Sequence, residues 1–190
     1  MTGHLQTRVL RALDRLEPWL LPALARFTFA ATLLLYYWSS ALTKLGDGPA
    51  AGLLTPSVGA YAQIFPRQLE AAGYDASQLS PLHDLVVLAG TWAEFLLPAL
   101  ILVGLLTRLA ALGMAGFVLL QSLTDVIGHG LGAAGGMWFD RMPDGVILDQ
   151  RLLWLFLLAY LTLRGGGPLS LDALLFRPGR AAPRLTTRRA

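Results

Sequence analysis

The chain of 190 residues is 55% hydrophobic and only 14% charged, with a mean hydropathy of +0.56. This composition and its long apolar runs exclude an ordinary soluble domain and indicate an integral membrane protein of one domain. No cysteine is present, which excludes disulfides, thiolate metal sites and thiol relays within the chain, and the net charge of +3 lies mainly in arginines near the two ends. We therefore expect the bilayer surface as partner, and no nucleic acid.

Residues 1–22 are predicted to form a basic amphipathic helix on the cytoplasmic membrane surface. Its apolar and basic positions fall on different helical faces: Leu5, Val9, Ala12, Leu13 and Leu16 against Arg8, Arg11 and Arg15. At the other end, residues 165–190 are predicted to form a basic cytoplasmic tail rich in proline and glycine.

Between these ends lie four apolar segments, each close to the length of about 20 residues that crosses a bilayer. They are predicted at residues 23–45, 82–104, 107–127 and 146–163, within a membrane domain of residues 23–164. The fold class is therefore predicted as all-α, an integral membrane antiparallel four-helix bundle. The turn at 105–108 is so short that the second and third spans should be neighbours.

The connection at 46–80 contains several aromatic and aliphatic residues and is too apolar for a disordered linker. It predicts short helices in the first extracytoplasmic loop, the first beginning at Thr55-Pro56. In the third span, Ala110, Gly113 and Gly116 favour close approach of a neighbouring helix.

Lysine and arginine are distributed unequally between the two sides of such a bundle. Of the 15 in the chain, eleven fall on the side of the termini, and four, Lys44, Arg67, Arg141 and Arg151, fall on the other. The positive-inside rule then predicts cytoplasmic termini, with the bacterial inner membrane as location. Arg26 and Lys44, at the two ends of the first span, are expected to extend to the membrane interfaces.

Glu94 lies near the centre of the second span. A charged residue there costs about 3 kcal/mol on insertion scales. The twelve Leu, Ile, Val and Phe residues of 82–104 offset that cost. Glu94 should therefore face protein or a water-filled cavity. Two interpretations stand side by side: a protonated structural acid bonded to a neighbouring helix, and an acid that handles protons or a ligand.

Other polar residues are expected near the outer ends of the spans. His83 begins the second span, and Gln121, Asp125 and His129 follow one another at helical spacing along the end of the third. We expect the two imidazoles to approach each other, with Asp84 and Asp125 beside them, and to exchange protons with the outer aqueous phase. Solvated interfacial side chains are the simpler alternative. The spacing fits no metal or haem motif.

Several short motifs resemble the DoxX family of small bacterial and archaeal membrane proteins. They are Arg26 and Lys44-Leu45 around the first span, then Glu94, Gly104, Thr107 and Arg108, and finally Gly167-Pro168-Leu169-Ser170-Leu171-Asp172. The resemblance covers about residues 23–176 and implies a four-helix membrane bundle. Some relatives are subunits linked to quinone-dependent sulfur oxidation, such as thiosulfate:quinone oxidoreductase, and others are accessory proteins of membrane redox complexes.

The resulting hypothesis is a quinone-associated subunit that works with a partner protein, which would supply any thiol chemistry. Quinone would arrive from the bilayer near Trp38 and Trp92, with Lys44 and Arg151 as further cofactor contacts. Glu94 would exchange a proton with it, and the group of His83, Asp125 and His129 would connect to water. A non-catalytic scaffold or small-solute conduit is the alternative. The oligomeric state stays open, a homo-oligomer included.

Overall fold

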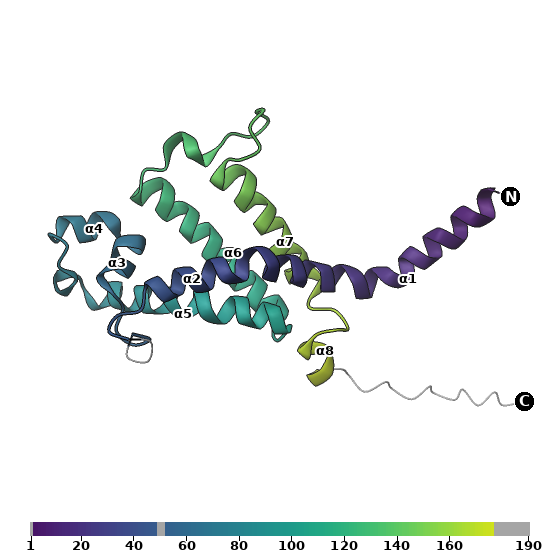
Figure 1. Ribbon diagram of the computed structural model, residues 1–190, viewed down its shortest axis with the longest axis horizontal. Helices are drawn as coiled ribbons and strands as arrows, with labels where there is room; N and C mark the ends of the chain where they lie inside the picture. Colours follow the sequence, from purple (N-terminus) through teal and green to yellow (C-terminus); the bar gives the residue numbers. More distant parts are fainter. Residues whose placement is uncertain (1, 49–51, 177–190) are drawn as a thin grey trace, which may run out of the picture.

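The computed structural model describes residues 2–48 and 52–176, and this part of the chain is helical without a β-strand. Four of its helices are long and apolar enough to cross a membrane: Gln6–Thr43, Pro81–Val103, Thr107–Gly128 and Val146–Arg164. The prediction of an all-α membrane bundle with four spans is confirmed, and the chain is a multi-pass membrane protein. In Figure 1 the first two of these helices run along the long axis of the molecule, and the last two cross them obliquely.

The first span belongs to one uninterrupted helix, composed of α1 (Thr2–Phe29), a π-helical segment at Ala30–Leu34 and α2 (Leu35–Thr43). The predicted boundary between residues 22 and 23 has no counterpart in this helix. Pro18 and Pro22 lie inside α1, whose N-terminal part extends away from the bundle beyond a bend (Figure 1). Prolines inside a helix account for such a bend, because each proline removes one backbone hydrogen bond.

The first loop folds into a small cap, defined as α3 (Val58–Ile64), α4 (Pro66–Ala71) and the 3-10 turn Ala76–Gln78. The predicted short helices are confirmed, but the first begins at Val58, with Ser57 as its N-cap, instead of at Thr55-Pro56. The Ser57 hydroxyl accepts from the amide of Ala60, a side-chain N-cap that proline cannot supply. Three apolar residues of the cap pack against Val87 of α5: Ala60, Tyr61 and Leu69.

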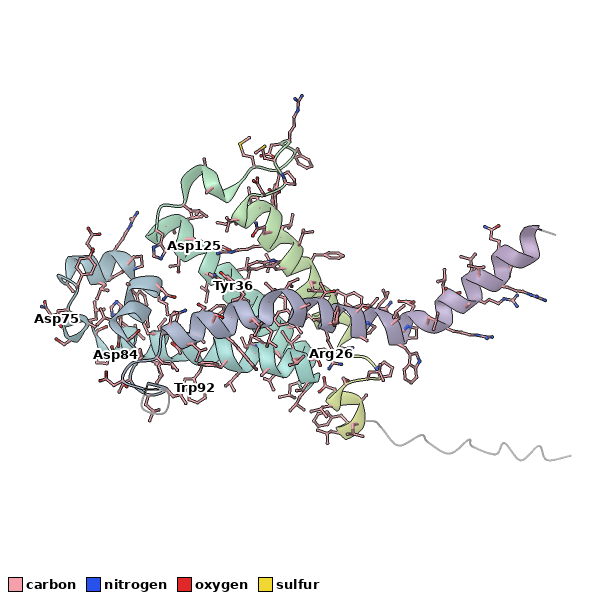
Figure 2. All side chains as sticks on the ribbon, in the orientation of Figure 1. Arg26, Tyr36, Asp75, Asp84, Trp92 and Asp125 are labelled. Atoms are coloured by element: carbon pink, nitrogen blue, oxygen red, sulfur yellow. The ribbon has the colours of Figure 1, made fainter. Side chains whose placement is uncertain are left out.

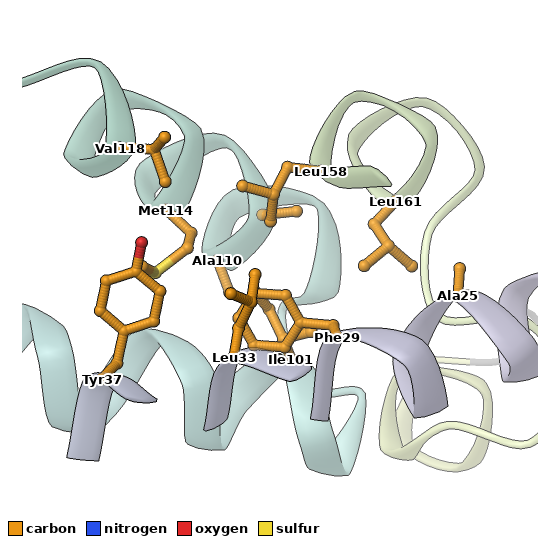
Figure 3. Packing of buried hydrophobic residues seen from close by; sticks show 11 residues of the cluster. Ala25, Phe29, Leu33, Tyr37, Ile101, Ala110, Met114, Val118, Leu158 and Leu161 are labelled. Carbon is orange, nitrogen blue, oxygen red and sulfur yellow. The ribbon is translucent and has the colours of Figure 1, made fainter. Parts of the chain in front are cut away.

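The remaining spans are α5 (Pro81–Val103), α6 (Thr107–Leu123) with the π-helical segment Thr124–Gly128, and α7 (Leu152–Arg164) after the π-helical segment Val146–Arg151. A 3-10 turn, Gly132–Gly135, lies in the third loop, and α8 (Leu171–Leu175) follows α7. Helix α6 lies against α5, as the short turn at 105–108 predicted, and also against α7, while α2 lies against α5 and α1 against α7. The bundle core joins all four spans (Figure 3): Phe29, Leu33, Tyr37, Ile101, Ala110, Met114, Val118, Leu158 and Leu161.

Arg26 fastens the end of the bundle opposite the cap. Its guanidinium donates to the carbonyls of Ile101, Leu102 and Leu169, at 3.1, 2.5 and 2.7 Å. The C-terminal carbonyls of α5 and the segment after α7 thus satisfy the donors of Arg26. Its place at the membrane interface stays a prediction. Asp172 completes the closure by accepting from the amides of Leu106 and Thr107 at the start of α6.

The first part of the predicted tail, residues 165–176, is therefore folded and packs on the bundle. The remaining residues of the tail, 177–190, lie outside the described ranges, as do their arginines at 177, 180, 184, 188 and 189.

Gly104 permits the turn between α5 and α6, and replacing it should be costly. Its φ is +72°, and an added Cβ would lie 2.5 Å from Ser170 Cβ and 2.8 Å from Arg26 Cζ. Gly104→Ala should lower stability by about 2 kcal/mol or more, because left-handed backbone alone costs about 1–2 kcal/mol. Thermal unfolding in detergent measures the loss.

Gly116→Ala is the matched control, since nothing lies within 4 Å of an added Cβ inside α6. It should raise stability slightly, as alanine is the better helix former. Equal melting temperatures for the two variants would contradict the tight closure at Gly104.

Candidate functional site

The charge predicted for the second span is paired with a lysine inside the bundle. The Nζ atom of Lys44 lies 3.0 and 2.9 Å from the two carboxylate oxygens of Glu94. Ser40 joins them, accepting from Lys44 Nζ at 2.7 Å and donating to Glu94 Oε1 at 3.1 Å. Lys44 is only 3% exposed and Glu94 only 4%. We call Ser40, Lys44 and Glu94 the α2–α5 ion-pair cluster.

Lys44 therefore does not extend to the membrane interface as the sequence suggested. The chain folds back over it, with the amide of Ser57 bonded to the carbonyl of Lys44 and a bridge between Leu45 and Pro56. Under this cover Lys44 keeps only 3% of its surface exposed. Burial of an ammonium is tolerated only with hydrogen-bonded compensation, and Glu94 and Ser40 provide it.

A second ion pair joins α6 to α7. The Nη2 atom of Arg151 donates to Asp125 Oδ2 at 2.5 Å, and its Nη1 donates to Ser122 Oγ at 3.1 Å. Asp125 and Arg151 both lie in π-helical segments, Thr124–Gly128 and Val146–Arg151, and such segments are frequent at functional sites. The buried Nε of Arg151 has no hydrogen-bond partner among the described residues.

Tyrosines and a glutamine occupy the space between the two ion pairs. Tyr37 donates its hydroxyl to Gln121 Oε1 at 3.3 Å, and Gln121 Nε2 donates to the hydroxyl of Tyr36 at 2.9 Å. The fully buried Tyr37 ring is within electrostatic range of both Arg151 and Glu94. The polar groups of four spans thus form three separate hydrogen-bonded groups at one level inside the apolar bundle, a level that we call the polar layer.

A cavity of about 700 Å³ opens beside this layer, between α2, α5, α6 and the cap. Its polar lining comes from Ser40, Lys44 and Glu94 on one side and from Gln121, Asp125 and His129 on the other. Its walls are apolar: Ile64, Phe65, Val86, Ala89, Ala93, Leu97, Phe117, Leu120 and Leu123. We call it the central cavity.

The three small residues of α6 that were predicted to allow close helix approach do not all serve that purpose. Ala110 is buried in the core, and a Cβ on Gly113 would lie 3.3 Å from Leu97, so both allow close helix packing. Gly116 faces open space in the central cavity instead. Gly113 also lines the cavity, so close helix approach extends to the cavity wall.

The two histidines have separate partners. His83 Nδ1 lies 2.8 Å from Ser80 Oγ, and its ring packs against Phe65 with centroids 4.7 Å apart. His129 Nε2 lies 3.0 Å from the carbonyl of Gln63. The predicted meeting of the imidazoles does not occur, because residues 63–65 of the cap lie between the two rings.

Asp84 is likewise directed to the cap. It accepts from the hydroxyl of Tyr61 at 2.7 Å, and burial together with this bond raises the pKa of Tyr61 to about 12. Figure 2 shows Asp84 near the cap, Asp125 at the same end of the bundle and Arg26 at the opposite end. Within the described residues, no group of three or more His, Asp or Glu side chains is arranged to hold a metal ion.

The residues predicted to handle protons and to contact the cofactor are only partly brought together, and His83 does not line the central cavity. Glu94, Lys44, Asp125 and His129 all line the central cavity, and Arg151 reaches it through Asp125. Trp38 and Trp92 do not line it, because each indole N–H donates to a backbone carbonyl, of Phe95 and Leu53 respectively.

Sequence reasoning missed Ser40 and Tyr36 as members of the site. The available signal was helical spacing, since Ser40 lies four residues before Lys44 on the same helix and Tyr36 eight before it.

In comparisons with protein-family models, curated proteins and solved structures, nothing matches this chain. The geometry defines a class: a four-span membrane bundle whose inner cavity ends on buried, paired charges. The resemblance to the DoxX family rests on the sequence motifs alone.

The α2–α5 ion-pair cluster should be strongly coupled. Lys44→Met leaves a buried carboxylate without its cation and Glu94→Leu leaves a buried ammonium, so each should destabilise by about 3–5 kcal/mol. The double variant removes both charges and should recover most of that loss. Unfolding of the three variants in one detergent measures the coupling energy.

Val87→Ala on α5 controls for general loss of packing, because it removes buried apolar volume without touching a charge. Combined with Lys44→Met, it should give an additive loss. Additive losses in the Lys44/Glu94 double variant would show that the pair does not act as a unit.

Proposed function

We propose that this protein is a quinone-associated subunit of a membrane redox complex, of the DoxX type, with the central cavity as the quinone site. The observation that carries the proposal is the cavity of about 700 Å³ inside the spans, with apolar walls and a polar layer at one side. Ligand sites for small molecules have volumes of about 300–1,000 Å³ and a few polar groups on apolar walls.

Quinones match this lining in size and polarity. A quinone head is planar and carries two carbonyl acceptors. Gln121 Nε2 has a second N–H to donate besides the one bonded to Tyr36, and the ammonium of Lys44, whose own donors bind Glu94 and Ser40, places a positive charge at the other side of the lining. Several lining residues of α5 and α6 are exposed within the spans, including Val86 and Leu120. That exposed side supports a route by which an apolar tail reaches the lipid.

A bound quinone supplies redox chemistry in which two electrons and two protons convert it to quinol. The partner subunit provides the electrons in this proposal. Glu94 moves a proton to or from a carbonyl oxygen, and Lys44 balances the negative charge that develops there. Asp125 and His129, at the water-facing end of the same cavity, exchange protons with the aqueous phase.

A scaffold without catalysis is the second candidate, and one observation favours it. Both oxygens of Glu94 already accept hydrogen bonds, from Lys44 and Ser40, so the cluster is saturated without any ligand. Its role would then be to fix α2 against α5, with a lipid tail or small solute in the cavity. Quinone content separates this candidate from the first.

Gly116→Leu tests the quinone site by filling it. Gly116 lines the cavity with no atom within 4 Å of an added Cβ, so the larger side chain enters free space and leaves the ion-pair cluster intact. Quinone that co-purifies in mild detergent, extracted and quantified per mole of protein, should fall about tenfold or more, as an occupied pocket loses its apolar contacts.

Leu119→Phe is the control, because Leu119 is 57% exposed on α6 and does not line the cavity. It should retain wild-type quinone. Wild-type protein purified from its native membrane without quinone would sink the proposal and leave the scaffold.

The orientation is part of the same proposal: cytoplasmic termini in a bacterial inner membrane, based on the eleven-to-four division of lysine and arginine. Single cysteines can report it, since the chain has none. Glu70→Cys and Asp140→Cys should react with an impermeant thiol reagent in intact cells, whereas Arg108→Cys and Leu185→Cys should react only after permeabilisation. Labelling of residue 108 in intact cells would reverse the topology.

A further inference from the structure

A second pocket lies at the end of the bundle that Arg26 closes. It has a volume of about 460 Å³ and lies between the first turn of α6, the last turn of α7 and the segment that leads to α8. Two arginines, Arg108 and Arg164, and the backbone of Gly165 form part of its lining. It is separate from the central cavity, with which it shares no residue.

Arg108 has charge to offer a ligand. Its side chain is exposed, and within residues 2–48 and 52–176 its guanidinium makes no hydrogen bond or ion pair. A Cβ on Gly165 would lie 3.3 Å from the Nε of Arg108, so the guanidinium lies directly over the glycine backbone. Gly165 has a φ of +77°, which favours glycine, and the absence of a side chain leaves the space of the pocket open at this position.

Arg164 adds a second positive charge from α7. Its Nη2 donates to Glu17 of α1 at 2.5 Å, yet the arginine side chain stays 59% exposed. The contact with Glu17 uses one of five N–H donors, and the others are free for a ligand.

The one acid of the lining is already engaged. Asp172 directs its carboxylate to the amides of Leu106 and Thr107 and to the Thr107 hydroxyl, at 2.6, 2.9 and 2.7 Å. Its charge therefore serves the start of α6, and the face of the pocket near Arg108 and Arg164 remains positive.

The depth of the pocket identifies its environment. Arg108 is the second residue of the span Thr107–Gly128, and Arg164 is the last residue of the span Val146–Arg164. Both guanidiniums thus lie where the apolar spans end, at the level of lipid headgroups. Apolar lining continues beside them on exposed side chains, Leu109 at 66% and Phe176 at 61%.

We propose that this pocket binds the phosphate of an anionic phospholipid, with Arg108 and Arg164 on the headgroup and Leu109 beside an acyl chain. Arginine recognises phosphate oxygens through two parallel N–H donors, and basic pockets between spans bind anionic lipid headgroups. The proposal is independent of the quinone site.

The test uses the full chain purified in mild detergent and delipidated. Phosphatidylglycerol should raise its melting temperature, and native mass spectrometry should show bound phosphatidylglycerol, whereas phosphatidylcholine should have little effect. In Arg108→Gln and Arg164→Gln, the affinity for phosphatidylglycerol should fall about tenfold each, since charge-assisted hydrogen bonds are lost. Both side chains are exposed, so the variants should fold.

Three controls make the result specific. Arg67→Gln removes an exposed charge in the cap, at the other end of the bundle, and should bind like wild type. Glu17→Gln breaks the ion pair with Arg164 while keeping the arginine, so lipid binding should persist or strengthen. Arg108→Lys keeps the charge without the paired donors and should lie between wild type and Arg108→Gln.

Two outcomes overturn the proposal. Unchanged phosphatidylglycerol binding in the double variant Arg108→Gln/Arg164→Gln would remove the site. Inorganic phosphate alone, tested at the same concentrations, would overturn the lipid assignment if it reproduced the full stabilisation while phosphatidylglycerol added nothing.

Discussion

The buried pair of Lys44 and Glu94 is the constraint on which the arrangement of the spans depends. A carboxylate near the middle of an apolar helix is tolerated when a partner compensates it, and Lys44 and Ser40 bring α2 against α5 to do so. Asp125 and Arg151 impose the same requirement on α6 and α7. Near the cap, one ion pair thus joins α2 to α5 and the other joins α6 to α7. The central cavity lies where these two pairs of helices face each other.

The two ends of the bundle differ because their polar groups are used differently. At the closed end, Arg26 joins α1 to α5 and to the segment after α7, and Asp172 holds the start of α6. Gly104 turns the chain there within a few residues, which forces α5 and α6 together. Towards the other end the helices diverge, as Figure 1 shows, and the cap covers the resulting space through contacts such as His129 with Gln63.

The proposed quinone site and the proposed lipid site follow from this asymmetry. Divergence near the cap leaves room for a ligand inside the hydrocarbon region, next to charges that are already paired. Closure at the opposite end fills the interior and leaves two exposed arginines, Arg108 and the Glu17-paired Arg164, on the outer surface at the ends of the spans. One end therefore offers hydrogen-bonding groups in an apolar cavity, and the other offers positive charge at the membrane interface.

Composition and apolar length by themselves determined the four spans, the helical loop and the pairing of α5 with α6, because these depend on local hydrophobicity and on a turn of a few residues. They also required Glu94 to face inwards. Only the tertiary structure decided which residue pairs with Glu94. Lys44 is 50 residues away in the sequence, and the residues at the end of a span have the same character whether water or protein covers them. The same reason separates His83 from His129: both lie at matching helix ends, but the packing of the cap places Phe65 against one and Gln63 against the other.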